Sequence, residues 1–390
     1  MNFTDTQVAT SETARDINRG IVLNLIRRRQ PISRADLARV SGLQRSTVSL
    51  IAEQLIREKW VIHAPAGQLT RGRRPTFLQL NHHRAILMVD LRPEMTSVAV
   101  ADVNGTFLAQ QRIPTPADPD TAVAKFSAEI RRMMESHPNL IFEGIGVSVP
   151  GRFDESRQRV VFAPNLPWPQ FDLKEPLEKA TGLPVELENT ANACVLAEVW
   201  FGEGEKTRDL TVVTVSEGVG VGIFSEGRLV WGLNGMAGEF GHIPLDMEGP
   251  RCSCGRRGCW EVYASNRAAV RYYESSAPSG LGFDDILELA EHGNSQALEA
   301  LDRMAHAIGR GTRMIVACIA PEEIVFVGEF TRMWNRLGSI IAAEVAESVL
   351  PGLPPTIRLA GASGAGLRGA LALVLAKAFC PSATWRNAAT

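Results

Sequence analysis

The feature that most limits the fold of this chain is a plan of secondary structure that occurs twice. Three strand-like segments joined by short turns run from residue 85 to 113, with an Asn-Gly turn, and again from 210 to 232, with glycine-containing turns. Each set is followed by a helical pattern and a buried strand, at 120–136 and 141–151 in the first half and at 297–319 and 324–328 in the second. Two α/β halves of this kind usually enclose a cleft, so we predict a two-lobed body.

Charge divides the chain differently. Residues 1–84 carry 14 Lys and Arg against 6 Asp and Glu, a net charge of +8, whereas the remaining residues carry 27 against 37, a net charge of −10, and the two sum to the −2 of the whole chain. A basic head on an acidic body indicates that the head meets a polyanion. A solvated basic surface is the alternative reading, and it needs a structural argument to displace it.

That argument comes from the helical pattern of the head. A first helix, ended by Pro31, carries an apolar series at helical spacing, Ile17, Ile21, Leu25 and Ile26. A capping box at Ser33 and Asp36 begins a short second helix that Gly42 ends, and its inward residues are Leu37 and Val40. A third helix over about 44–58 has the buried stripe Val48, Ile51, Ala52, Leu55 and Ile56. This order predicts a helix-turn-helix.

The second helix of a helix-turn-helix lies in the major groove of DNA with its first turn at the base edges. There Arg45 can reach guanine and Gln44 can reach adenine, and small hydroxyl groups allow close approach. Two strands at 60–62 and 76–80 predict a wing, and its loop 71-RGRRP-75 suits phosphates or a narrow minor groove. We therefore predict DNA contacts from Ser33, Arg34, Gln44, Arg45, Ser46, Thr47, Ser49, Arg71, Arg73 and Arg74.

Composition excludes several classes of protein. With 45% hydrophobic and 22% charged residues, the 390-residue chain is not disordered as a whole. Its longest apolar runs are too short to cross a bilayer, and its N-terminus lacks the apolar segment of an export signal. Six cysteines in a chain of this length do not form a disulfide scaffold, so we expect a cytoplasmic protein with reduced thiols and no membrane partner.

Three of the cysteines lie within the stretch 252-CSCGRRGCWE-261, ten residues after His242. Three thiolates and an imidazole suit a tetrahedral, structural Zn²⁺, and four protein donors leave no open position for catalysis. A chance cluster of small buried residues is the alternative, which the neighbouring arginines disfavour. We therefore predict Cys252, Cys254, Cys259 and His242 as zinc ligands, and the isolated Cys194, Cys318 and Cys380 as core residues.

From about residue 17 to 380 the chain resembles the ROK family of repressors and sugar kinases. The resemblance rests on 144-GIGVSVPG-151, 164-PNLPW-168, 188-ENTANA-193, 218-GVGVGIFSEG-227, 235-GMAGEFGH-242 and the cysteine stretch. It implies an α/β fold in which a winged helix-turn-helix precedes a two-lobed, actin-like body of the sugar-kinase type. The helix-turn-helix makes the chain similar to the repressor branch, which includes NagC-type and Mlc-type regulators.

The resemblance also implies domain boundaries. The DNA-binding domain, with its wing and linker, would occupy residues 1–80. The first lobe would comprise 81–190 and about 366–386, and the second lobe, with the zinc site, 191–365.

The resemblance implies that this chain lacks the phosphate loops and the catalytic base of the family's kinases. Their first loop reads Asp-x-Gly-Gly-Thr, where this chain has 90-DLRPE-94, with Arg92, Pro93 and Glu94 in the loop. Glu217 replaces the threonine of the second loop, and Thr190 replaces the aspartate that removes the proton from the sugar hydroxyl. We therefore expect no kinase activity, with a bifunctional sugar kinase that also binds DNA as the alternative.

In contrast, the resemblance implies that most of the family's sugar-binding residues are present in this chain. It implies sugar contacts from Asn165, Asn189, Glu239, His242 and Glu261. Planar amides, carboxylates and an imidazole are the groups that hold sugar hydroxyls. The expected protein is a sugar-responsive transcriptional regulator, most simply a repressor, whose homodimer or tetramer binds a pseudo-palindromic operator. A regulator controlled by a protein partner instead of a sugar is the remaining alternative.

Overall fold

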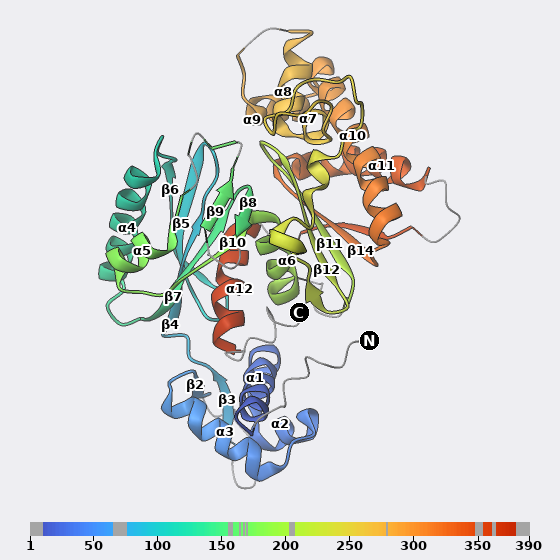
Figure 1. Cartoon of the computed structure of the whole chain (residues 1–390). Helices are drawn as coiled ribbons and strands as arrows, with labels where there is room; N and C mark the ends of the chain where they lie inside the picture. The colour runs from blue at the N-terminus through green and yellow to red at the C-terminus, as the bar shows by residue number, and fades with distance from the viewer. Residues whose placement is uncertain are drawn as a thin grey trace.

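The computed structural model describes residues 11–64, 76–154, 159–163, 165–166, 168, 171–202, 207–277, 280–347, 354–360 and 364–379. A small helical domain lies beneath two α/β lobes that stand side by side (Figure 1). Within the described residues, no helix combines the length and apolar character that a membrane span requires.

The small domain is a winged helix-turn-helix. It comprises α1 (Ser11–Arg29), α2 (Arg34–Ser41) and α3 (Arg45–Arg57), with the antiparallel strands β1 (Ile32–Ser33), β2 (Val61–His63) and β3 (Phe77–Leu80) in the order β1-β3-β2. The Ser33 hydroxyl accepts the amide of Asp36 at the start of α2, and Gly42 ends α2 with a φ of 72°. These features confirm the predicted capping box and turn, while the loop 71-RGRRP-75 lies outside the described residues.

The prediction that Val40 of α2 faces inward is wrong, because its side chain is 37% exposed. In α1 the apolar series does not coincide with the buried side, since Ile17 and Ile21 are 42% and 40% exposed. The buried hydrophobic residues of α1 are Val22, Leu23 and Ile26. The reason is that α1 packs against the other two helices and also against the C-terminal helix of the body, so its buried side is set by two partners.

The first lobe is built on a mixed sheet of five strands in the order β10-β7-β4-β5-β6. Its elements are β4 (Arg84–Asp90), β5 (Met95–Asp102), β6 (Phe107–Pro114), α4 (Pro119–Ser136), β7 (Ile141–Val149), α5 (Lys174–Thr181) and β10 (Val185–Asn189), with a hairpin of β8 (Arg152–Asp154) and β9 (Arg159–Phe162). The helices α4 and α5 cover one face of the sheet. The other face packs on α12 (Ala365–Phe379).

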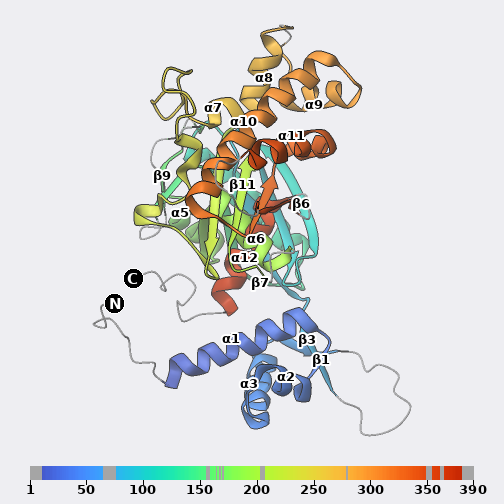
Figure 2. The same cartoon turned by 90° about the vertical axis from the view of Figure 1, so that its right-hand side faces the viewer.

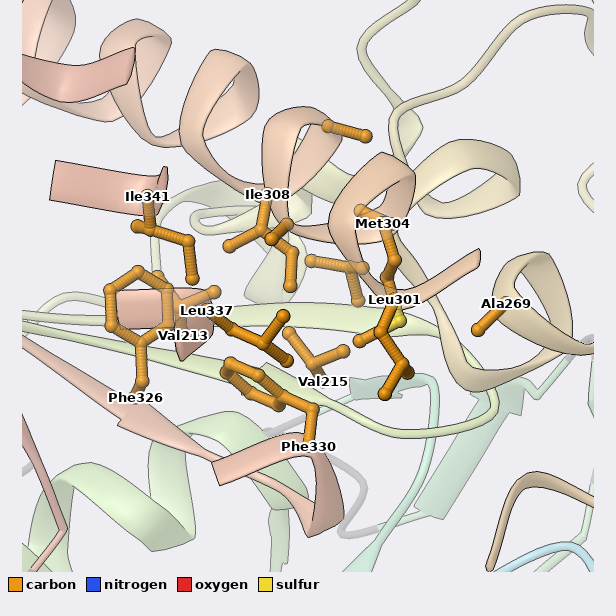
Figure 3. Close-up of a cluster of buried hydrophobic side chains, with 14 of the residues drawn as sticks. Val213, Val215, Ala269, Leu301, Met304, Ile308, Phe326, Phe330, Leu337 and Ile341 are labelled. Carbon is orange, nitrogen blue, oxygen red and sulfur yellow. The ribbon is translucent and has the colours of Figure 1, made fainter. Parts of the chain in front are cut away.

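The second lobe repeats this plan, as the sequence predicts. Its five-stranded sheet has the order β13-β12-β11-β14-β15. Its strands are β11 (Leu210–Val215), β12 (Val219–Ser225), β13 (Arg228–Leu229), β14 (Glu323–Val327) and β15 (Thr356–Leu359). Its helices are η3 (Leu233–Gly235), η4 (Glu239–His242), α7 (Glu261–Ala264), α8 (Asn266–Glu274), α9 (Phe283–Glu291), α10 (Ser295–Ile319), η5 (Glu329–Met333) and α11 (Trp334–Ala346). Figure 3 shows its core, where Val213 and Phe326 of the sheet meet Ile308 of α10 and Ile341 of α11.

The helices α6 (Thr190–Phe201) and α12 pack against each other, and α6 also packs on β11 and β12 of the second lobe. Two glycines permit the close packing of α12: a Cβ at Gly146 would overlap with the backbone of Ala370, and one at Gly369 would overlap with the backbone of Ala193. The predicted lobe boundary at residue 190 therefore falls at the start of a helix that touches both lobes.

The winged helix-turn-helix domain lies beneath the body, next to the end of α12 (Figures 1 and 2). A continuous apolar core joins the two. The ring of Phe379, at the end of α12, lies edge-on to Trp60 at 5.8 Å and to Trp200 of α6 at 5.2 Å. Arg27 of α1 stacks 4.6 Å above the Trp200 ring and donates to the Trp200 carbonyl oxygen at 2.6 Å. We call the contacts among Arg27, Trp60, Trp200 and Phe379 the junction.

Candidate functional site

A pocket opens between the two lobes at the N-terminal end of α6. From the first lobe it is lined by Gly151, Arg152, Asn165, Asn189 and Thr190, and from the second by Gly218, Glu239, His242 and Glu261. All five residues predicted to hold a sugar therefore line one pocket. Both lobes contribute polar groups to it, so a bound molecule would touch both.

Asn189 organises the wall on the first lobe. It is the N-cap of α6, where its Oδ1 accepts the amide of Ala191 at 2.8 Å. Its Nδ2 donates to the Gly151 carbonyl oxygen at 2.5 Å. One amide thus starts the helix and holds the Pro-Gly loop in place. Each of its two polar atoms still has hydrogen-bonding capacity left for a ligand, because an amide oxygen has two lone pairs and an NH₂ group two hydrogens.

Glu239, His242 and Glu261 face this wall from the second lobe. Nε2 of His242 lies 3.7 Å from Glu239 Oε2, and its Nδ1 lies 3.6 Å from Glu261 Oε1. Burial raises the pKa of Glu239 above its ordinary value, and the nearby Glu261 adds to the shift, although electrostatic interactions with His242 and Arg152 oppose it. Gly218 leaves room here, since a side chain at this position would press on Glu261 and Asn165.

The cysteine loop forms the outer side of this wall. The ligand atoms of His242, Cys252, Cys254 and Cys259 all lie within 4.8 Å of one another. A tetrahedral zinc with Zn–S bonds of about 2.3 Å and a Zn–N bond of about 2.0–2.1 Å gives S···S edges of about 3.7–3.8 Å and S···N edges of about 3.6 Å. Cys254 Sγ and Cys259 Sγ are 3.7 Å apart, and Cys252 Sγ lies 3.6 Å from His242 Nδ1. The four residues fit a metal ion.

The cluster and the pocket share His242, and Glu261 of the pocket contacts a cysteine of the cluster. Nδ1 of His242 faces the cysteines, which leaves Nε2 toward Glu239 and the pocket. Glu261 Oε1 lies 2.8 Å from Cys252 Sγ, and Glu261 lies at the start of α7 directly after the loop. The loop therefore sets the position of two groups that line the pocket.

The residues that the sequence predicts to replace the kinase motifs line this pocket or the cavity next to it. The hydroxyl of Thr190 lies 3.1 Å from Ser148 Oγ, and Glu217 is half-buried in the turn between β11 and β12. Glu94 is exposed. Arg92 donates to Asp90 at 3.0 Å and to Glu329 of the opposite lobe at 2.8 Å.

Some of the residues predicted to contact DNA are exposed, and others form hydrogen bonds within the domain. Gln44, Arg45 and Ser46 are exposed at the start of α3, and Thr47 and Ser49 are half-buried. Ser33 is buried with its hydroxyl in the cap of α2, and Arg34 pairs with Glu53 of α3 at 2.6 Å. Arg71, Arg73 and Arg74 lie outside the described residues.

Sequence reasoning missed two residues at these surfaces. Leu50 is 72% exposed on α3, one turn after Ser46. Its position outside the apolar stripe of this helix could have indicated its exposure from the sequence. Arg152 brings a positive charge to the pocket. It directly follows the Pro-Gly loop, and that position was its only sequence signal.

Comparison with known proteins agrees with this architecture. The model of the ROK family matches residues 87–377. A xylose repressor of Bacillus spizizenii is 32% identical over 352 residues, which cover 89% of this chain and 91% of that protein. The crystal structure of a ROK family transcriptional regulator, a homologue of the E. coli Mlc protein, has a TM-score of 0.80 at 26% identity and covers 94% of this chain and 98% of that one.

A kinase of the family covers a smaller share of this chain. A ROK family glucokinase from Streptomyces griseus, in complex with glucose and AMPPNP, has a TM-score of 0.66 at 30% identity and covers 74% of this chain and 98% of that one. The family model spans both lobes, and the repressor similarity extends over most of the whole chain. The chain therefore belongs to the ROK family.

Proposed function

We propose that this protein is a sugar-responsive transcriptional repressor that binds operator DNA and has no kinase activity. The observation that carries the proposal is the course of α6. This helix begins at the pocket with Asn189 and Thr190 and ends at the junction with the DNA-binding domain, where Arg27 contacts Trp200. The similarity to a xylose repressor supports a small sugar as the effector.

The exposed start of α3 is the proposed reading surface for DNA. Arg45 and Gln44 would reach base edges in the major groove, and the three arginines predicted in the wing loop would contact phosphates. A homodimer, or a tetramer formed from it, places two such helices on a pseudo-palindromic operator in the cytoplasm. Half-sites lie a fixed number of helical turns apart, so a small rotation between subunits weakens binding.

Sugar binding would change the angle between the lobes, because the pocket takes polar groups from both. The helix α6 has 12 residues, a length of about 18 Å at 1.5 Å per residue, and it transmits the movement to the junction. The close backbone packing of α12 on the sheet and on α6 makes this pair move as one body.

A structural Zn²⁺ is part of the proposal. Three thiolates and one imidazole favour zinc among the common metals, and four protein ligands complete its shell. The ion would hold the loop that positions Glu261 and orient the ring of His242 through Nδ1.

Phosphate transfer is not supported by the cleft. Thr190 offers a hydroxyl where the family's kinases use an aspartate base, and a hydroxyl has too high a pKa to be ionised at neutral pH and so cannot act as that base. Glu217 is half-buried in the turn where a phosphate loop would lie, and its carboxylate repels a triphosphate. We therefore propose that the cleft senses sugar and performs no chemistry.

The test begins with an operator selected by the full-length protein from random-sequence DNA. Operator binding is then measured by fluorescence anisotropy with D-xylose, D-glucose, N-acetylglucosamine and their phosphates. We expect one of these sugars to release the operator, and Glu239→Gln to bind the operator normally but need much more sugar. Release by none of them, together with sugar phosphorylation when ATP and Mg²⁺ are added, would favour the kinase alternative.

A further inference from the structure

Arg92 holds an unusual position in the cleft. It lies in the loop between β4 and β5, at a place where the family's kinases have glycine, and its side chain is 34% exposed. Its Nε donates to Asp90 Oδ2 at 3.0 Å, and its Nη1 donates to Glu329 Oε1 at 2.8 Å. Asp90 ends β4 of the first lobe, whereas Glu329 begins η5 of the second lobe. One guanidinium therefore connects the two lobes.

The surroundings support both ends of this connection. Glu329 Oε2 accepts Nδ2 of Asn266, at the start of α8, at 3.2 Å. Asp90 is buried, and Gly366 in the first turn of α12 packs so closely on its carboxylate that a Cβ there would overlap with it. The positive end of the α12 dipole faces this negative charge, which favours it. Each carboxylate thus has a close neighbour in its own lobe as well as Arg92.

Arg92 also borders two cavities. It lines the pocket described above, and it lines a second cavity that is bounded by Arg112, Arg271 and Asp284. Glu217 is the other residue that lines both cavities. In a nucleotide-dependent relative, glycines leave space for phosphates.

We propose that Arg92 is a positioning residue that holds the two lobes together without a nucleotide. We call its contacts with Asp90 and Glu329 the Arg92 clamp. The clamp lies between the pocket and α12, so it favours the lobe arrangement in which both walls of the pocket face each other. In this protein an arginine side chain performs the bridging that a bound nucleotide can perform in an enzyme of this shape.

The clamp has a consequence for ligand affinity, and this part depends on the proposed sugar-binding function. A ligand that contacts both lobes binds only the fraction of molecules in which the walls are correctly placed, and its apparent dissociation constant rises as that fraction falls. Loss of the clamp should therefore weaken sugar binding, even though the clamp consists of contacts from Arg92 to Asp90 and Glu329 and not to the sugar. Two further contacts bridge the lobes, Asn165 to Arg267 at 2.7 Å and Trp231 to Glu188 at 2.9 Å, so the effect is partial.

The first measurement needs no ligand. Hydrogen exchange by mass spectrometry is recorded on the full-length protein and on Arg92→Ala, Arg92→Lys, Glu329→Gln and the Arg92→Ala/Glu329→Gln double variant. We expect faster exchange in segments 90–95 and 328–333 for Arg92→Ala and Glu329→Gln, with no further increase in the double variant. The lysine variant should be intermediate, because an ammonium lacks the fork that reaches two carboxylates. The control is Arg336→Ala, which removes an exposed ion pair with Asp302 within the second lobe.

The second measurement is calorimetric titration with D-xylose, or with the sugar that releases the operator. We expect the dissociation constant to rise about 3- to 30-fold in Arg92→Ala and in Glu329→Gln, the range between exposed ion pairs and hydrogen bonds to charged groups. Unchanged exchange on both sides of the cleft in Glu329→Gln, or effects of the two substitutions that add in the double variant, would overturn the clamp. If the wild-type protein binds no sugar, the proposed function fails, while the exchange data still decide on the clamp.

Discussion

Substitution of one cysteine of the metal loop provides a test in which geometry sets the expected numbers. Cys254 is half-buried, whereas Cys252 and Cys259 are buried, so Cys254→Ser removes a ligand with little effect on packing. For the wild-type protein we expect one zinc per chain and an X-ray absorption spectrum with three sulfurs at about 2.3 Å and one nitrogen at about 2.0–2.1 Å. The variant should show two sulfurs.

The affinity for zinc should fall by at least the roughly 10- to 100-fold that outer-shell partners of a metal contribute. Each factor of ten is about 1.4 kcal/mol, so the metal would stabilise the folded variant by about 1.4–2.8 kcal/mol less than it stabilises the wild type. The affinity for sugar should fall as well, because Glu261 Oε1 lies 2.8 Å from Cys252 Sγ and moves with the loop. Operator affinity without sugar should not change, because the DNA-binding domain packs on the opposite ends of α6 and α12.

The assays are zinc competition with a fluorescent chelator, thermal unfolding, and sugar and operator titrations. The matched control is Cys318→Ser. The sequence predicted Cys318 to be a core residue, and this was wrong, because the cysteine is exposed near the end of α10, outside the cluster. Zinc affinity and coordination that remain as in the wild type would refute the assigned ligand set. Loss of zinc with sugar affinity intact would refute the link between the loop and the pocket.

Three further predictions concern other parts of the molecule. Arg27→Ala removes the hydrogen bond to the Trp200 carbonyl and the stacking on its ring. Sugar should still bind with wild-type affinity but release the operator less completely. Full release at the same sugar concentration would show that the junction does not transmit sugar binding to the DNA-binding domain. We expect the exposed side chain of Leu50 to pack on a thymine methyl group, so Leu50→Ala should weaken operator binding by about 1–2 kcal/mol. Replacing that thymine with uracil should lower the operator affinity of the wild-type protein but not that of the variant. Gly146→Ala should lower the free energy of unfolding in urea by about 1–3 kcal/mol, because the added Cβ would overlap with the backbone of Ala370. An unchanged urea midpoint would show that α12 can move away from β7.

Local patterns were sufficient for much of the architecture. The second helix of the head was predicted from Ser33, Asp36 and Gly42, because capping and a left-handed turn depend on neighbouring residues. The three-stranded units in both lobes followed from apolar runs and short turns, since strand pairing across a tight turn is also local. The candidate metal ligands could be named for a similar reason: three of the four lie in one short loop, and the chemistry of thiolates and imidazole is specific.

Only the tertiary structure decided which residues far apart in the chain contact each other. The buried side of α1 could not be read from its spacing, because the helix packs on two sets of partners and one of them, α12, lies more than 300 residues later. Arg92 was understood from the sequence as the absence of a glycine, and its role across the cleft depends on Glu329, 237 residues away, whose approach is set by the angle between the lobes. Amino-acid sequence determines which groups the protein carries and how each segment begins and ends, whereas the packing of distant segments determines which charges meet.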